Sequence, residues 1–194
     1  YYLLKDGNKV IPFVTRMFPT RSQHKISVML NEMNQQVSSY IRGQITVAIC
    51  VGFTYIIGYT LIGLPYGVTI GMIAGLLTII PYIGSIIGLT PALIIGFVTN
   101  PTLALHVLLV FVIEQLIESR VLQPLILGSS LKMHPVTILI ILLAAGKMFG
   151  LVGLLIAVPG YAVVKVFITH FFAWYKEYSG LYYNDKVEEV QIEE

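Results

Sequence analysis

Glu114 and Glu118 are the residues whose type and spacing most directly suggest chemistry. They stand four positions apart in an apolar stretch, so on a helix their carboxyl groups share one face. A charge near the centre of a membrane span costs about 2.5 kcal/mol or more, and such charges usually mark the path of an ion or substrate. Two carboxylates on one face also repel each other, so one of them could carry a proton. We expect Glu114 to be the more deeply buried.

Arg120, Lys147 and His134 are the other candidates for a transport pathway. Lys147 lies between two apolar runs, where it would either reach out to water or act as a counter-charge to the glutamates. His134 could cap a helix or line a connector. Potential metal ligands lack usable spacing, so we expect no metal and no cofactor. Nucleotide-binding loops and hydrolase motifs do not occur in the sequence, so we expect no enzyme activity.

The composition shows what kind of chain must position these residues. Hydrophobic residues make up 56% of the 194 residues and charged residues only 11%, whereas soluble domains carry about 25% charged residues. No Asp, Glu, Lys or Arg occurs between Arg42 and Glu114. A soluble domain would need more polar residues to cover its surface. The sequence therefore predicts an integral membrane protein, and it offers no basic soluble face for nucleic acid.

We expect an all-α fold in three parts. Residues 1–43 are basic and include an amphipathic helix from Ser22, so the positive-inside tendency places them in the cytoplasm. Residues 44–175 form a polytopic transmembrane bundle, and residues 176–194 form an acidic tail. A start at Tyr1 without an initiating Met suggests that earlier spans precede this chain.

Proline and glycine interrupt the apolar stretches of the bundle. After a span over Gln44–Leu64, the two pieces that flank Pro81 hold only about 15 residues each, which is short for a straight crossing. Either a helix is kinked at Pro81 or the pieces form a re-entrant hairpin. Broken backbone in a bilayer is stable only when it is buried in protein or lines a watery cavity. The predicted helix breaks are Pro81, Tyr82, Gly84 and Pro159.

The remaining helices are predicted from the same pattern of prolines and glycines. We expect a helix over Thr102–Glu118, a connector up to Lys132 and an interruption at Gly146–Gly150. Glycines at every fourth position let helices approach closely. The same close approach can occur between subunits, so we expect a homo-oligomer that is surrounded by membrane lipid. The predicted packing glycines are Gly67, Gly71, Gly75, Gly84, Gly88, Gly146 and Gly150.

Several motifs together resemble one family of bacterial membrane proteins. Pro81-Tyr82-Ile83-Gly84, Pro124-Leu125-Ile126-Leu127-Gly128 and His134-Pro135 occur in the order and spacing typical of the autoinducer-2 exporter family. Glu118, Gly146–Gly153 and Ala157-Val158-Pro159 fit the same pattern. Arg120 departs from it, because many members have Asn there. A positive charge at this position could neutralise Glu118.

The resemblance implies a larger permease of about eight spans in the bacterial inner membrane. Its substrate would be a small polar metabolite or signal such as autoinducer-2. Some relatives resemble sodium–proton antiporters, so the alternative is exchange of sodium or lithium for protons through Glu114 or Glu118. A third hypothesis, which comes from the amphipathic helix, is a membrane scaffold that transports nothing.

Overall fold

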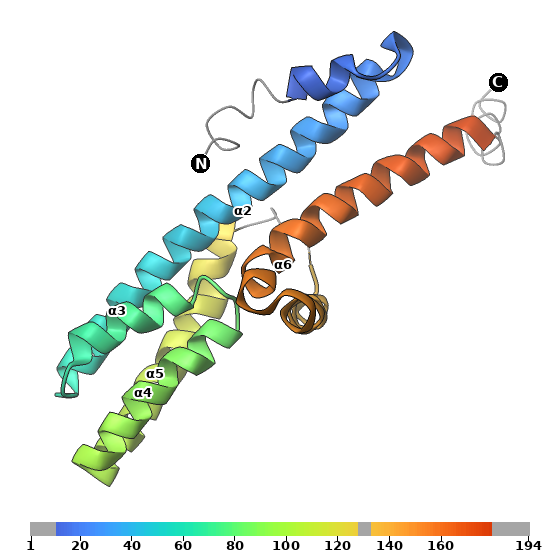
Figure 1. The fold of residues 1–194 in the computed structure, drawn as a ribbon. Helices are drawn as coiled ribbons and strands as arrows, with labels where there is room; N and C mark the ends of the chain where they lie inside the picture. Colours follow the sequence, from blue (N-terminus) through green and yellow to red (C-terminus); the bar gives the residue numbers. More distant parts are fainter. Residues whose placement is uncertain (1–10, 128–132, 180–194) are drawn as a thin grey trace, which may run out of the picture. The chain divides into compact units, whose positions relative to one another are not determined.

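The computed structural model describes residues 11–127 and 133–179, and within them it contains helices and no β-strand (Figure 1). The helices are α2 (Thr20–Leu61), α3 (Gly67–Leu77), α4 (Ile83–Thr99), α5 (Pro101–Ile117), the π-helix η1 (Glu118–Leu127) and α6 (Pro135–Ser179). The all-α prediction is confirmed. Predictions for residues 1–10, for Gly128 and Lys132 in the connector, and for tail residues 180–194 lie outside the described residues.

In the part of the chain that the structure describes, three helical stretches are long and apolar enough to cross a membrane, judged by length and composition: Ser22–Leu61, Pro101–Leu127 and Val136–Lys176. Helices α3 and α4 are apolar as well but have only 11 and 17 residues. At 1.5 Å per residue they measure roughly 16 and 25 Å, less than a hydrocarbon layer of about 30 Å. The expected combination of full-length and shortened apolar helices is therefore present.

The chain divides into two compact units. The bundle unit comprises Ser38–Pro159, and the terminal unit comprises, in its described part, residues 11–37 and 160–179. Helices α2 and α6 contribute residues to both units. The boundary predicted between residues 43 and 44 falls inside α2, which is continuous from Thr20 to Leu61.

Glycines bring α2 and α3 of the bundle unit into backbone contact. A Cβ atom added to Gly71 would lie 2.7 Å from the backbone nitrogen of Ile56, and one added to Gly75 would lie 2.8 Å from the backbone nitrogen of Gly52. These neighbours are backbone atoms that cannot rotate away. The two helices are therefore held by close dispersion contact, as small residues allow in membrane proteins.

Helices α3 and α4 form a hairpin rather than one kinked helix (Figure 1). A Cβ atom at Gly88 of α4 would lie 2.9 Å from the Cα atom of Ala74 in α3, so the chain returns alongside itself. Tyr82 at the reversal has φ of 61°, a left-handed conformation that is uncommon for residues other than glycine. The predicted break at Pro81–Tyr82 is present, whereas Gly84 lies inside α4 and packs tightly against Leu77.

The break is enclosed by protein. Gln44 on α2 donates a hydrogen bond from Nε2 to the carbonyl oxygen of Thr78 at 2.8 Å, and both residues are buried. Ile80 packs in a small apolar cluster with Leu142 and Ala157. A carbonyl group released by the end of α3 thus finds a protein partner, which is the condition for broken backbone at membrane depth.

The last helical stretch has the predicted interruption at Gly150, but the predicted packing role of this glycine and the predicted break at Pro159 are not found. Gly150 interrupts α6 with φ of 60°, and no atom lies within 4 Å of the place where its Cβ would be. It therefore serves as a conformational hinge rather than a packing glycine. The predicted break at Pro159 is absent, because α6 continues through this proline with helical backbone. Transmembrane helices tolerate proline where local adjustments satisfy the freed carbonyl group.

Helix α5 follows its prediction closely, but the connector after it does not. The side chain of Asn100 caps α5 by accepting a hydrogen bond from the Thr102 backbone nitrogen at 3.0 Å. The residues that follow Ile117 continue as the π-helix η1, where we expected a connector. A π-helix is rare, and single π turns inside helices are frequent at functional sites.

Candidate functional site

The two predicted glutamates come together at the junction of α5 and η1. Glu114 lies in the last turn of α5, and Glu118 is the first residue of η1. Both side chains are buried, with 0% of Glu114 and 4% of Glu118 exposed to solvent. Ionisable side chains are seldom buried to this degree without a partner. The pair is therefore the first feature that any account of this unit must explain.

Two glutamine side chains hold this carboxylate pair. Gln115 donates from Nε2 to Glu114 Oε2 at 3.1 Å and to Glu118 Oε2 at 3.4 Å, while Gln123 donates from Nε2 to Glu118 Oε1 at 3.1 Å. We call Glu114, Gln115, Glu118 and Gln123 the acidic cluster. Three of its four carboxylate oxygens accept a hydrogen bond, and Glu114 Oε1 has no partner among the described residues.

Tyr55 and Tyr59 of α2 complete the site on the side of Glu114. Their rings stack with centroids 5.2 Å apart, and both side chains are 0% exposed. Both interact electrostatically with the Glu114 carboxyl group, and the hydroxyl of Tyr55 lies against it. Neither hydroxyl makes a hydrogen bond within the described residues. The site thus contains three buried side-chain oxygens, Tyr55 Oη, Tyr59 Oη and Glu114 Oε1, that have no hydrogen-bond partner within the described residues.

A glycine between these two tyrosines explains how α5 can lie close to α2. Gly58 faces Val110 of α5, and a Cβ atom at this glycine would collide with the valine side chain. Val110 lies one turn before Glu114, on the same face of α5. The glycine thus lets α5 come close enough to α2 for Glu114 to reach the two tyrosines.

The other predicted pathway residues do not join the site. Arg120 and Lys147 have exposed side chains, and within the described residues neither forms an ion pair with a glutamate. The expected neutralisation of Glu118 by Arg120 is therefore not observed. His134 caps the start of α6, where its Nδ1 accepts a hydrogen bond from the Val136 backbone nitrogen at 3.4 Å. Of the two roles predicted for His134, capping a helix is the one that agrees with this contact.

The arrangement suits protons or a small polar solute better than a metal. Among the described residues, no group of three or more His, Cys, Asp or Glu side chains could hold a metal ion. The site offers carboxylate and phenol oxygens together with amide donors, which can all exchange hydrogen bonds with a polar molecule.

Sequence reasoning missed Tyr55, Tyr59, Gln115 and Gln123. The spacing of four between the tyrosines in an uncharged span would have indicated one helix face. Nothing in the sequence indicated that this face opposes Glu114, because that pairing joins residues more than fifty positions apart. The glutamines stand beside the glutamates, but the donor role of Gln123 depends on the π-helix, which was not expected.

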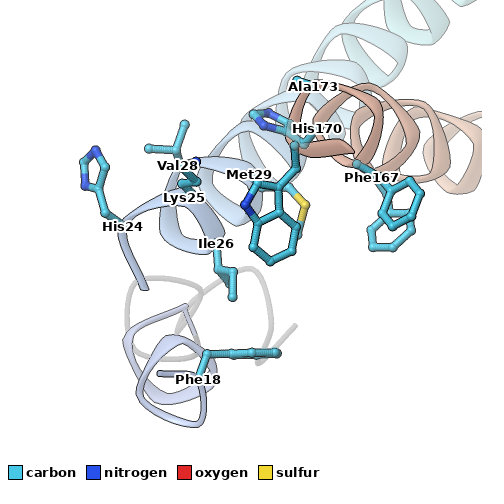
Figure 2. Close-up of a pocket in the computed structure, with 11 residues that line it drawn as sticks. Phe18, His24, Lys25, Ile26, Val28, Met29, Phe167, His170 and Ala173 are labelled. Atoms are coloured by element: carbon cyan, nitrogen blue, oxygen red, sulfur yellow. The ribbon is translucent and has the colours of Figure 1, made fainter. Parts of the chain in front are cut away.

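The terminal unit contains a cavity of about 460 Å³ (Figure 2). Its walls are almost entirely apolar, and Figure 2 shows Phe18 and Phe167 among the aromatic side chains that approach it. His170 at its rim forms a contact of 2.7 Å between its Nε2 and Oε2 of Glu32, which is an ion pair when the histidine is protonated. The full lining is Phe18, His24, Lys25, Ile26, Val28, Met29, Phe167, His170, Phe171, Ala173 and Trp174.

Comparison with known proteins identifies the sequence as similar to membrane transport proteins. Residues 1–173 match the profile of the AI-2E family transporter. The chain is similar to two candidate transport proteins of Bacillus subtilis, YrrI, with 38% identity over 171 residues, and YueF, with 36% identity over 167 residues. It is also similar to PerM of Escherichia coli, a candidate permease, with 28% identity over 170 residues.

These alignments cover most of this chain but only part of each relative. They include 88% of the chain for YrrI, 86% for YueF and 87% for PerM, against 48%, 45% and 48% of those proteins. The chain therefore spans about half the length of the curated relatives it matches. No solved structure matches it.

Proposed function

The chain belongs to the AI-2E family of transporters, and from this premise we propose that it exports a small polar solute, such as the signal autoinducer-2, across a bacterial cell membrane. The observation that carries the proposal is the acidic cluster. A buried carboxylate in a helix long enough to cross a membrane is costly and usually marks a substrate or ion path. The enclosed break between α3 and α4 supports the same reading, since transporters build sites from discontinuous helices.

In this proposal the acidic cluster and the two tyrosines form the polar centre of the route. Hydroxyl and carbonyl groups of a solute would exchange hydrogen bonds with Glu114 Oε1 and the hydroxyls of Tyr55 and Tyr59, which have no partner among the described residues. The apolar walls around these residues would exclude charged solutes. Glu118, which both glutamines hold, would keep the local field negative and thus position the donors of the solute.

The test is export by the full-length protein in reconstituted vesicles, with autoinducer-2 as the probe. We expect vesicles that contain the wild-type protein to release the loaded probe faster than loaded vesicles without protein do. Glu114→Gln should slow this release, and Glu32→Gln in the terminal unit should not, because Glu32 is 45% exposed. Release at the rate of empty vesicles by the wild type would refute export of this solute.

Exchange of sodium or lithium for protons is the second candidate function. The favouring observation is that, within the described residues, no Lys or Arg forms an ion pair with either buried glutamate. An uncompensated carboxylate attracts a proton or a monovalent cation. Addition of sodium or lithium to acid-loaded vesicles should then release protons in the wild type and not in Glu114→Gln or Glu118→Gln. Unchanged proton release in both variants would exclude this function.

The proposed setting is the bacterial inner membrane, with residues 8–43 in the cytoplasm and with a second copy of the chain as partner. Lys and Arg concentrate in that segment, which favours the cytoplasmic side. Large apolar side chains on α6, such as Val164 and Phe167, are exposed and require lipid or another subunit to cover them. A cysteine at position 25 should react only with reagents that reach the cytoplasm, and cross-linking should yield oligomers.

A further inference from the structure

The two buried glutamates differ in the number of hydrogen bonds that their carboxylate oxygens accept. Both carboxylate oxygens of Glu118 accept from amide groups, which can only donate at these atoms. Glu114 accepts one such bond at Oε2, and within the described residues its Oε1 accepts none. A carboxylate whose two oxygens both accept is held as an anion. A carboxyl group with one oxygen free of donors can carry a proton on that oxygen.

Electrostatics favours one proton on this pair. The two carboxyl groups are neighbours on one helix face, both are buried, and within the described residues neither has a cationic partner. Two adjacent negative charges in a medium of low dielectric constant cannot both be retained at reasonable cost. The ionisable groups around Glu114 are Tyr55 and Tyr59 from α2 and Glu118 from η1, and Tyr82 from the α3–α4 reversal faces Glu118. All of these are neutral or negative, so none of them supplies a compensating charge.

The tyrosine hydroxyls suit a group that changes its protonation state. A phenol hydroxyl both donates and accepts hydrogen bonds. When Glu114 is protonated, its Oε1–H can donate to the oxygen of Tyr55. When the proton has left for water or a solute, the hydroxyl of Tyr55 or Tyr59 can turn and donate to the ionised Oε1. Either state of Glu114 can thus be satisfied by the same two side chains.

A bound divalent cation fits the three unpartnered oxygens less well than a proton does. Calcium and magnesium take six or more oxygen ligands, whereas among the described residues this site offers only Glu114 Oε1 and the two phenol oxygens free of hydrogen bonds. A proton needs one donor and one acceptor. The number of available oxygens therefore favours the proton.

We propose that Glu114 with Tyr55 and Tyr59 forms a single-proton binding site, with Glu118 as a fixed anion beside it, and that binding and release of this proton drive export of the solute. The coupling part of this proposal rests on the proposed transport function. The assignment of the proton to Glu114 does not, because it follows from the contacts alone.

The first experiment tests the proton on the full-length purified protein by infrared difference spectroscopy between acid and alkaline buffer. We expect a carbonyl stretching band of a buried protonated carboxyl group that is lost in Glu114→Gln and retained in Glu32→Gln. At acid pH, Glu118→Gln should also retain it. Glutamine imitates the neutral form of Glu114, so this variant should keep its fold, which circular dichroism checks. A band that persists in Glu114→Gln, or that vanishes in Glu118→Gln at acid pH, overturns the assignment.

The tyrosines give a second readout that a merely structural role would not move. Tyr55→Phe and Tyr59→Phe should shift the frequency of the band without abolishing it, because each removes a hydrogen-bond partner of the protonated group. Tyr66→Phe is the matched control, since the Tyr66 side chain is 77% exposed. A band that stays at the wild-type frequency in both buried variants removes the tyrosines from the site.

The second experiment tests the coupling in vesicles loaded with autoinducer-2. An imposed pH gradient should raise export severalfold in the wild type and leave export by Glu114→Gln unchanged. If the wild type exports but ignores the gradient, the coupling is wrong and the transport function stands. If the wild type exports nothing, the proposed function fails, and the infrared result still decides whether Glu114 holds the proton.

Discussion

The bundle unit and the terminal unit treat their carboxylates in opposite ways. In the bundle unit, Glu114 is fully buried and has no cationic partner within the described residues. In the terminal unit, Glu32 is 45% exposed and lies 2.7 Å from His170. Water screens the interaction between Glu32 and His170, so this pair contributes little to stability or function. The buried carboxylate of Glu114, in contrast, is costly to keep ionised unless a proton or another ligand compensates its charge. Burial without a counter-charge, rather than the mere presence of a carboxylate, is what indicates function here.

The two units also differ in how closely their helices approach. Glycines in the bundle unit leave no space for a Cβ atom at the α2–α3 contact, while Gly160 in the terminal unit has no atom within 4 Å of its Cβ position. The terminal unit instead contains an apolar cavity (Figure 2). Substitutions placed in matched pairs, one in each unit, can test these differences.

The largest effect is expected from a methyl group at the contact between α2 and α3. Gly75→Ala would place its Cβ against the backbone of Gly52, so we expect a loss of about 1–3 kcal/mol in the free energy of unfolding from overpacking. Gly160→Ala in the terminal unit should be neutral or gain up to about 1 kcal/mol from helix propensity. Thermal unfolding in detergent measures both. Equal effects of the two substitutions would remove the contrast in packing.

The next effect concerns transport. Glu114→Gln should reduce transport by the full-length protein at least tenfold, equivalent to about 1.4 kcal/mol in the activation barrier. Glu32→Gln should leave the transport rate close to that of the wild type, because its side chain is solvated. Initial rates in reconstituted vesicles provide the measurement. A comparable loss in both variants would show that burial does not distinguish the two glutamates.

A smaller effect is expected from the buried tyrosines. In our proposal the Tyr55 hydroxyl exchanges a hydrogen bond with Glu114, so Tyr55→Phe removes one hydrogen bond, which contributes about 0.5–1.5 kcal/mol. The variant should therefore lose a little stability and transport more slowly. Unfolding temperature and transport rate must be compared on the same preparation. Lower stability with normal transport would contradict the assignment of this hydroxyl to the site.

The smallest effect is expected from the exposed pair. His170→Gln should change the free energy of unfolding by less than about 1 kcal/mol, as is usual for solvent-exposed ion pairs. Gln44→Leu serves as the buried counterpart, because it removes the donor to the Thr78 carbonyl oxygen and should cost about 1–3 kcal/mol. Denaturation of both variants under the same conditions tests the contrast. A larger loss in His170→Gln would reverse it.

Much of the architecture could be predicted from patterns that are local in the sequence. Apolar runs, Asn100–Pro101 and Pro81–Tyr82 predicted helix ends that the structure confirms. The break at Gly150 was predicted within its glycine-rich stretch, but its role in conformation rather than packing depends on the φ angle of the folded chain. Pro159 shows the opposite limit, because the folded helix accommodates a residue that usually breaks one. Local sequence states a tendency of the backbone, and neighbouring helices decide whether it prevails.

The sequence by itself determined that this is a membrane-embedded helical protein, that its apolar stretch is broken near Pro81, and that Glu114 and Glu118 share a face. Only the tertiary structure decided that Tyr55 and Tyr59 oppose Glu114, that Gln115 and Gln123 hold Glu118, and that Arg120 and Lys147 stay outside. The physical reason is one of range. Hydropathy and helical periodicity act within a few turns, whereas the environment of a buried charge is set by side chains that come from distant helices.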